Sequence, residues 1–349
     1  MQTTPRPLLS VCVPLYNRAT ELAPLIESVL AQSCTDWELV LSEDASPEQP
    51  SIREAVAPFR VQLGDRLRYV ENPETLGYDG NFRQLVRLAR GRYVFILGND
   101  DRVAPGAFQA IADALTRYGD VGMFLRAFAT FHGDPSNLVQ VNRFFPTERW
   151  FPPGRAAFFA VYRRLVHMSG LVFHRDAAAA LETTQWDGTL FYQHWLGGNL
   201  ASTHGAIYLP DLLALFRTGG TPPQFGTARA EQGRFIPGIQ PPETDLRMNR
   251  DILAIAAAID ARHSLQALDA VRRDFARYSY PMLAHQAHQP WPILFRYYRD
   301  LGALGYARSG WYHLWFWTMI VLGERRLTAT LRWIRRALGY TPQLGRPLT

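Results

Sequence analysis

Short apolar runs alternate with helix-like patterns over the first hundred residues of the chain. Four runs have the length and the β-branched or aromatic composition of buried strands: residues 8–15, 37–41, 67–70 and 93–97. Residues 19–32 and 81–90 instead place apolar side chains three or four positions apart, which indicates amphipathic helices. This alternation predicts an α/β fold with a mostly parallel sheet and helices on both of its faces.

Polar clusters follow three of the predicted strands at the point where each strand ends. The clusters are residues 16–18 (YNR), residues 43–44 (ED) and residues 99–101 (NDD). In sheets of this kind, ligands bind outside the carboxyl ends of the strands. We therefore expect the three clusters to lie together and to form one binding site.

Two adjacent carboxylates, Asp100 and Asp101, follow the fourth strand directly. Such a pair at the end of a buried strand is costly unless its charge is compensated, and hard divalent cations prefer oxygen ligands. The alternative is a solvated Asp-Asp turn.

Three segments in this order resemble inverting glycosyltransferase family 2, which has the GT-A fold. The segments are VCVPLYNR (11–18), ELVLSEDAS (38–46) and NPETLGYDGNFRQLVRLARGRYVFILGNDD (72–101). The resemblance is strong over residues 8–110 and weaker at residues 168–175, which are similar to a later, acceptor-side segment of the family.

The resemblance implies a nucleotide-sugar site at the strand ends. The residues that it assigns to donor binding are Pro14, Tyr16, Asn17, Arg18, Glu43, Asp44, Asp79, Asn81 and Asn99. The family's metal motif is usually Asp-x-Asp with a further Asp, and here Gly98 stands at the first position. The resemblance then leaves Asp100 and Asp101 to hold Mg²⁺ or Mn²⁺, with Asp100 also near the donor. Asn17 and Asp44 would equally suit turns or helix caps.

The general base is harder to place. Inverting transfer needs a group that takes the proton of the acceptor hydroxyl, and family members usually supply an Asp from an acidic motif that is missing here. The nearest carboxylate is Asp187, which could instead be a turn residue before Gly188. The nearest other base is His194, which could instead be packed in an aromatic cluster.

Arg217 lies in a Gly- and Pro-rich segment, residues 216–223. At this place the family often has a basic residue and a mobile loop that closes over the diphosphate. The alternative for Arg217 is a linker arginine without a role in binding.

Composition narrows the remaining choices. The 349 residues are 47% hydrophobic and 19% charged, which is typical of a globular protein, and the net charge of +6 comes from arginine alone because the chain has no lysine. Two cysteines cannot form a disulfide framework, and no signal peptide is apparent, so we expect a reducing, cytoplasmic location. No nucleic-acid motif is visible.

The last hundred residues predict helices and a possible membrane contact. Residues 311–322 (WYHLWFWTMIVL) are apolar but too few to span a bilayer, and arginines surround them. Such a segment fits an in-plane anchor on the inner face of the cell membrane, formed by residues 308–336. The alternatives are a buried helix or a dimer interface, with a homo-oligomer possible.

Together these features predict a GT-A catalytic domain over residues 1–225, with a nucleotide-sugar half (1–110) and an acceptor half (111–225), followed by a helical region (226–349). The implied activity is metal-dependent transfer of a sugar from a nucleoside diphosphate sugar to a lipid-linked or cell-surface glycan. A degenerate domain that binds a nucleotide sugar or acts as a membrane scaffold is the alternative. A nucleotidyltransferase fits less well, because residues 14–17 are not a Gly-rich triphosphate loop.

Overall fold

The first half of the sheet is parallel, as the sequence predicts. The structure, a computed structural model, describes residues 6–220 and 224–344. Its first strands are β1 (Leu9–Leu15), β2 (Trp37–Glu43), β3 (Leu67–Glu71) and β4 (Tyr93–Ile96). They lie in the order β3-β2-β1-β4, and Val11 of β1 stands opposite Leu39 of β2 and Phe95 of β4. The carboxyl ends of these strands therefore meet at one edge.

The connecting helices are α1 (Leu22–Leu30), α2 (Gln49–Leu63) and α3 (Gly77–Leu88), with short 3₁₀ turns at Ala19–Glu21 and Gly64–Arg66. The third helix begins four residues before its predicted start. The apolar periodicity that marks a helix in sequence starts only at Phe82, whereas its first turn is held by carboxylates that accept the N–H groups of Gly77 and Tyr78.

The second half of the sheet is mixed rather than parallel. Its strands are β5 (Arg102–Val103), β6 (Met123–His132), β7 (Asp134–Asn142), β8 (Arg149–Phe151), β9 (Val172–His174) and β10 (Ala206–Arg217). The sheet continues from β4 in the order β9-β6-β10-β5, and β9 is antiparallel to both of its neighbours. Its helices are α4 (Ala107–Tyr118), α5 (Arg155–Tyr162), α6 (Arg175–Ala179) and α7 (Tyr192–His204), with a 3₁₀ turn at Arg163–Leu165.

Apolar cores fill both faces of the sheet. On one face, fully buried side chains of α1, α2 and α4 pack on the strands, among them Leu25, Ile52 and Phe108. On the other face, α3, α5 and α7 do the same, and that core continues without a break into the C-terminal helices. The sheet edge between these layers is left for the polar segments that follow the strands.

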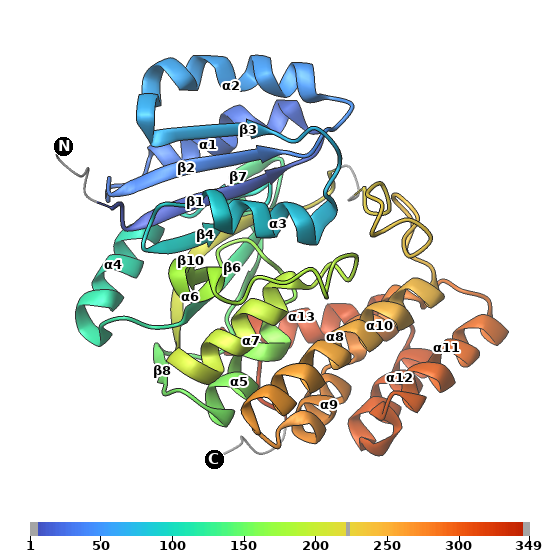
Figure 1. Cartoon of the computed structure of the whole chain (residues 1–349). Helices are drawn as coiled ribbons and strands as arrows, with labels where there is room; N and C mark the ends of the chain where they lie inside the picture. The colour runs from blue at the N-terminus through green and yellow to red at the C-terminus, as the bar shows by residue number, and fades with distance from the viewer. Residues whose placement is uncertain (1–5, 221–223, 345–349) are drawn as a thin grey trace.

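The helical region predicted beyond residue 226 is present and packs on the acceptor half (Figure 1). Its helices are α8 (Pro242–His263), α9 (Leu268–Arg277), α10 (Tyr280–His285), α11 (Trp291–Ala303), α12 (Gly310–Leu322) and α13 (Glu324–Leu338), with a 3₁₀ turn at Tyr306–Arg308. The hydroxyl of Tyr162 in α5 donates to the carbonyl of Ile252 in α8 over 2.7 Å. None of the described helices is both long and apolar enough to cross a bilayer.

A close approach between β1 and Gly91, which lies two residues before β4, provides a test of the parallel sheet. A methyl group on Gly91 would lie 2.6 Å from the backbone nitrogen of Ser10 and 2.7 Å from the carbonyl carbon of Leu9. We expect Gly91→Ala to lower the free energy of unfolding by about 1–3 kcal/mol, since the backbone must move to accommodate it. Urea denaturation measures this. Gly310→Ala is the control, because nothing lies within 4 Å of its added methyl group. Equal stability of the two variants would contradict the close approach.

Candidate active site at the carboxyl ends of the strands

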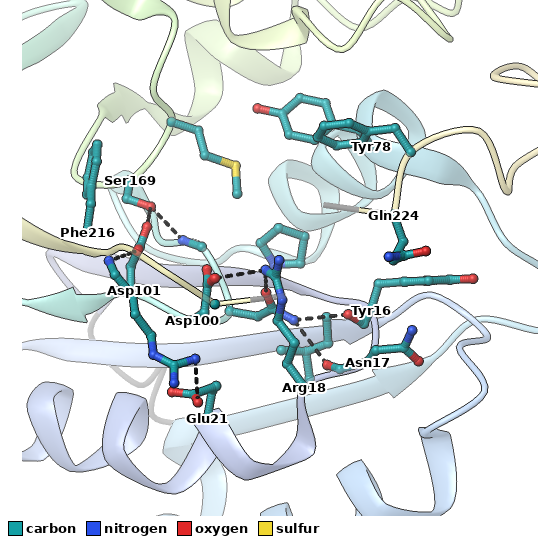
Figure 2. Close-up of a pocket in the computed structure, with 18 of the residues that line it drawn as sticks. Tyr16, Asn17, Arg18, Glu21, Tyr78, Asp100, Asp101, Ser169, Phe216 and Gln224 are labelled. Carbon is teal, nitrogen blue, oxygen red and sulfur yellow. Dashed lines mark hydrogen bonds and ion pairs between the residues drawn. The ribbon is translucent and has the colours of Figure 1, made fainter. Parts of the chain in front are cut away.

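The polar segments that follow β1, β2 and β4 line one cavity of about 780 Å³. The beginning of α3, the residues before β9 and the residues at the end of β10 complete its wall. Figure 2 shows Tyr16, Asn17 and Arg18 on one side, with Asp100 and Asp101 beside them and Tyr78 above. This volume is typical of a small-molecule site, and its place at the strand ends is the one expected for such a sheet.

The first loop is held in an unusual backbone conformation. Asn17 and Arg18 have φ angles of 56° and 65°, in the left-handed region that side-chain-bearing residues rarely adopt. The side-chain amide of Asn99 donates to the carbonyls of Tyr16 and Asn17, each over 3.2 Å. A guanidinium nitrogen of Arg18 lies 3.1 Å from Oδ1 of Asn99 and 3.0 Å from Oδ2 of Asp100. Backbone strain of this kind is often found at binding sites.

Asp100 and Asp101 have different environments. The side chain of Asp100 is 20% exposed and lies at the cavity beside Arg18. Asp101 also lines the cavity, but its carboxylate is held by the protein: its Oδ2 accepts from the hydroxyl of Ser169 (2.5 Å) and its Oδ1 from the backbone N–H of Arg217 (2.9 Å). Burial, and secondly the charge of Asp100, raise the pKa of Asp101 to about 7.

Gly98 leaves room for the carboxylate of Asp101. A methyl group on Gly98 would lie 2.9 Å from Oδ2 of Asp101 and 3.1 Å from Oγ of Ser169. A side chain at the position where the family usually has its first Asp would therefore crowd Asp101 in this chain.

Asp100 and Asp101 both line the cavity, but their partners differ. Each oxygen of Asp101 already accepts one hydrogen bond from the protein, whereas Asp100 pairs with Arg18. Among the described residues, no three His, Cys, Asp or Glu side chains gather around one point. Magnesium often binds through one or two carboxylates together with substrate phosphates, so Asp100 with a diphosphate fits this pattern.

Glu43 and Asp44 also differ. Glu43 is fully buried and accepts from the backbone N–H groups of Ala45 (3.0 Å) and Ser46 (2.8 Å), so it holds the turn after β2 and does not line the cavity. Asp44 does line the cavity, and it accepts from the N–H groups of Leu76 (2.8 Å) and Gly77 (2.9 Å) at the start of α3. Burial raises the pKa of Asp44 to about 6.

Asp79 lies behind the cavity wall rather than in it. Its two oxygens accept from the N–H groups of Leu190 (2.8 Å) and Tyr192 (2.9 Å), so it caps the start of α7. Burial raises the pKa of Asp79 to about 7. Asn81 does line the cavity; its amide donates to the carbonyl of Ser42, while its buried Oδ1 has no partner within the described part of the chain.

Neither candidate base faces the cavity. Asp187 forms an ion pair with Arg83 through both of its oxygens. His194 is fully buried between the rings of Tyr162 and Phe191, each 5.2 Å away, and burial lowers its pKa to about 3. The packed aromatic environment that we gave as the alternative for His194 is the one the structure has.

Arg217 does reach the cavity, where its guanidinium pairs with Glu21 over 2.6 Å. Thr218, Gly219 and Gly220 line the cavity after it, while residues 221–223 of the expected mobile loop lie outside the described residues.

The cavity is also lined by residues that the sequence did not predict, among them the titratable side chains of Glu21, Glu48, His167 and Glu231. Glu21 bridges Arg217 and Arg102. Glu231 lies beyond the predicted catalytic domain, yet its two oxygens accept from the N–H groups of Tyr78 (2.7 Å) and Gly226 (2.8 Å). His167 directly precedes the segment 168–175 that carries the weaker resemblance. No sequence pattern marks Glu21 or Glu231, because each reaches the cavity only through tertiary contacts.

Comparisons with known proteins agree with this geometry. Residues 10–170 match the family described as glycosyl transferase family 2. An uncharacterized protein of Mycobacterium tuberculosis is 26% identical over 203 residues, covering 52% of this chain and 61% of that protein. The abequosyltransferase RfbV of Salmonella typhimurium is 32% identical over 116 residues, covering 33% of this chain and 34% of RfbV. The chain thus spans less than two thirds of the length of these relatives.

A solved structure shares the fold over most of the chain. Residues 1–349 of TarS from S. aureus, in complex with UDP-GlcNAc, superimpose with a TM-score of 0.58 at 14% identity, covering 84% of this chain and 80% of that one. This likeness includes the GT-A-type sheet and extends into the helices that follow it.

The buried carboxylate of Asp79 predicts a pH dependence of stability. Its pKa is about 7 in the folded chain and near its ordinary value of about 4 in the unfolded chain, so between these values only the folded state holds the proton. The protonated carboxyl group of Asp79 therefore makes its full contribution to the free energy of unfolding below about pH 4, and this contribution is lost as the pH rises through about 7. Between pH 5 and pH 7 the free energy of unfolding of the wild type should therefore fall as the pH rises. We expect Asp79→Asn to reduce this slope by up to about 1.4 kcal/mol per pH unit.

Unfolding of both proteins in urea, at intervals from pH 5 to pH 8, measures this difference. Asp113→Asn, on an exposed position of α4, is the control and should keep the wild-type slope. Identical slopes for wild type and Asp79→Asn would contradict the buried, protonated carboxyl group.

Proposed function

Because the chain belongs to glycosyl transferase family 2 through its residues 10–170, we propose that it is an inverting glycosyltransferase. It transfers a sugar from a nucleoside diphosphate sugar to a hydroxyl group of a lipid-linked or cell-surface glycan. The observation that carries this proposal is the single cavity in which the segments following β1, β2 and β4 meet. The names of the relatives, which include an abequosyltransferase and a putative colanic acid glycosyl transferase of Escherichia coli, support a role in surface polysaccharide synthesis.

The side chains divide the cavity into two functional parts. Tyr16, Asn17, Asp44 and Asn81 form the part that receives the nucleoside. Arg18 and Arg217 lie at the part that receives the diphosphate. Two guanidinium groups there stabilise the negative charge that develops on the departing diphosphate.

A divalent cation, Mg²⁺ or Mn²⁺, held by Asp100 and the diphosphate would supply further positive charge on the leaving group. Asp101 has a positioning role, since its carboxylate ties the turn after β4 to Ser169 and to the end of β10. With such a cation bound, Asp100 would hold it in place of Arg18, and the guanidinium of Arg18 would be free to bind the phosphates.

Nucleotide binding tests the donor site and the metal site together. We expect one of UDP, GDP, CDP, ADP and dTDP to raise the melting temperature of the wild type in the presence of Mn²⁺, with UDP the first to try given the TarS complex. A nucleotide at a hundred times its dissociation constant adds roughly 2.7 kcal/mol of stability. Asp100→Asn should lose the Mn²⁺-dependent part of the shift.

Asp113→Asn is the matched control and should respond as the wild type does. If no nucleotide produced a shift, the catalytic proposal would fail, and a degenerate scaffold domain would be favoured. If Asp100→Asn kept the full Mn²⁺-dependent shift, the proposed metal ligand would be wrong.

An exposed aromatic surface on the C-terminal helices supports a membrane-bound acceptor. Trp291 and Phe295 of α11 are 50% and 44% exposed, and Trp317 and Val321 of α12 are 48% and 79% exposed. The other side of α12, including Phe316, is buried in the helical region. The apolar run of residues 311–322 therefore buries one side of α12 in the helical core and exposes its other side to solvent. The next helix, α13, exposes Trp333 together with four arginines: Arg325, Arg326, Arg332 and Arg336.

We propose that this surface, formed by α11, α12 and α13, rests on an anionic membrane. Tryptophan favours the membrane interface, and arginine favours anionic head groups. We expect the double variant Trp317→Glu with Val321→Glu to lower the fraction bound to phosphatidylglycerol vesicles by about tenfold, since it removes apolar contact and adds like charge. Vesicle flotation measures the bound fraction.

Val61→Glu is the control for this measurement, because Val61 is 90% exposed on α2, outside the proposed surface. Binding of the double variant at the wild-type level would refute the membrane contact. Wild-type binding to neutral phosphatidylcholine vesicles at the same level would refute the electrostatic part.

A further inference from the structure

The cavity wall contributed by the acceptor half contains a single side chain suited to accept a proton. Residues 130, 166–169, 216–220 and 224–225 form this wall among the described residues. Within it, only His167 and Arg217 carry titratable side chains, and a guanidinium cannot act as a base near neutral pH. We propose that His167 is the general base of the transfer reaction, an inference that rests on the proposed function.

Six carboxylates in the described ranges of the chain line the cavity, and each already has a partner. Glu48 accepts from the N–H of Ala19, and Asp101 accepts from Ser169 and from the backbone of Arg217. Asp100 is beside Arg18, and Glu21 is between Arg217 and Arg102. Asp44 and Glu231 accept the N–H groups at the start of α3. Inversion at the anomeric carbon requires the acceptor to attack from the side opposite the diphosphate, so the base belongs to the wall opposite Arg18 and Asp100.

Aromatic rings fix the imidazole of His167 in place. Its ring lies 5.4 Å from that of Phe128 in β6 and 5.3 Å from that of Phe216 in β10, measured between centroids. The rings of Phe128 and Phe216 in turn stack on each other at 4.3 Å. The imidazole thus borders the cavity from a rigid support on two adjacent strands.

The backbone around His167 is fixed as well. Arg126 is fully buried in β6, and its guanidinium donates to the carbonyl of His167 over 2.7 Å and to that of Ser169 over 2.8 Å. A buried arginine whose hydrogen bonds run to backbone carbonyls is costly, which points to a need to hold this segment. Arg126 is a positioning residue for His167.

The surroundings of the ring keep the imidazole neutral. Loss of water around the ring, and secondly the positive charge of Arg126, lower the pKa of His167 to about 4. The residue retains exposed surface at the cavity. Within the described part of the chain, the hydrogen bond of His167 runs through its carbonyl oxygen, and its ring nitrogens are left for a ligand. A neutral imidazole carries the lone pair that a base requires.

A ring nitrogen of His167 takes the proton of the acceptor hydroxyl while the acceptor oxygen forms a bond to the anomeric carbon. The bond between that carbon and the phosphate oxygen breaks, and its electron pair leaves with the nucleoside diphosphate. The imidazolium then returns its proton to water.

Chemical rescue distinguishes a base from a structural residue. The assay measures release of nucleoside diphosphate from UDP-, GDP-, CDP- and dTDP-sugars, with water as the acceptor. We expect His167→Ala to lower the rate with the accepted donor by about 10²–10⁴-fold. Free imidazole should then raise the rate of the variant by at least about tenfold. Nucleotide affinity in the thermal-shift assay should stay at the wild-type level. His204→Ala, at an exposed histidine outside the cavity, is the control.

Two results would overturn the inference while leaving the proposed function intact. One is a wild-type rate for His167→Ala, and the other is a loss of rate that imidazole does not restore and that is accompanied by weaker nucleotide binding. Absence of turnover by the wild-type protein with every donor would instead overturn the proposed function, and the role of His167 with it.

Discussion

The carboxylate of Asp101, on the cavity wall, is the contact on which the geometry of the cavity depends. It joins the turn after β4, the segment before β9 and the end of β10, through one hydrogen bond to Ser169 and one to the backbone of Arg217. These segments belong to both halves of the sheet, so one side chain sets the distance between the donor wall and the acceptor wall. Its raised pKa shows that the protein holds this carboxyl group against an electrostatic cost.

Tertiary contacts of this kind also explain which site residues could be identified from the sequence. The strands and the positions where they end follow from local apolar runs, and the structure brings together the three clusters predicted at those ends. What each carboxylate does there depends on which backbone N–H groups come within reach, and this is decided by tertiary structure. Glu43 and Asp44 are neighbours in sequence, yet one holds its own turn and the other holds the start of α3.

Residues whose partners are distant in sequence are the hardest to place from the sequence. Asp79 and Asp187 looked like site residues because they lie near recognisable segments, but Asp79 caps α7 and Asp187 pairs with Arg83. Glu231 lies beyond the segment that resembles the family, and only folding brings it to the cavity. The mixed order of the second half of the sheet escaped prediction for the same reason, since β9 is a short strand whose partners are distant in sequence.

Charge balance in the cavity connects the missing family aspartate to the proposed chemistry. With Gly98 at the first position and Asp101 held by Ser169 and Arg217, Asp100 is the carboxylate of this turn that lies against Arg18. Arg217 likewise lies against Glu21. Each arginine is therefore neutralised before a ligand arrives, which lowers the cost of burying it. A diphosphate that enters competes with these carboxylates for the same guanidinium groups, and because a phosphate can accept two parallel N–H bonds, it is a strong competitor. The pre-formed ion pairs thus hold the arginines in position without removing their capacity to bind the donor.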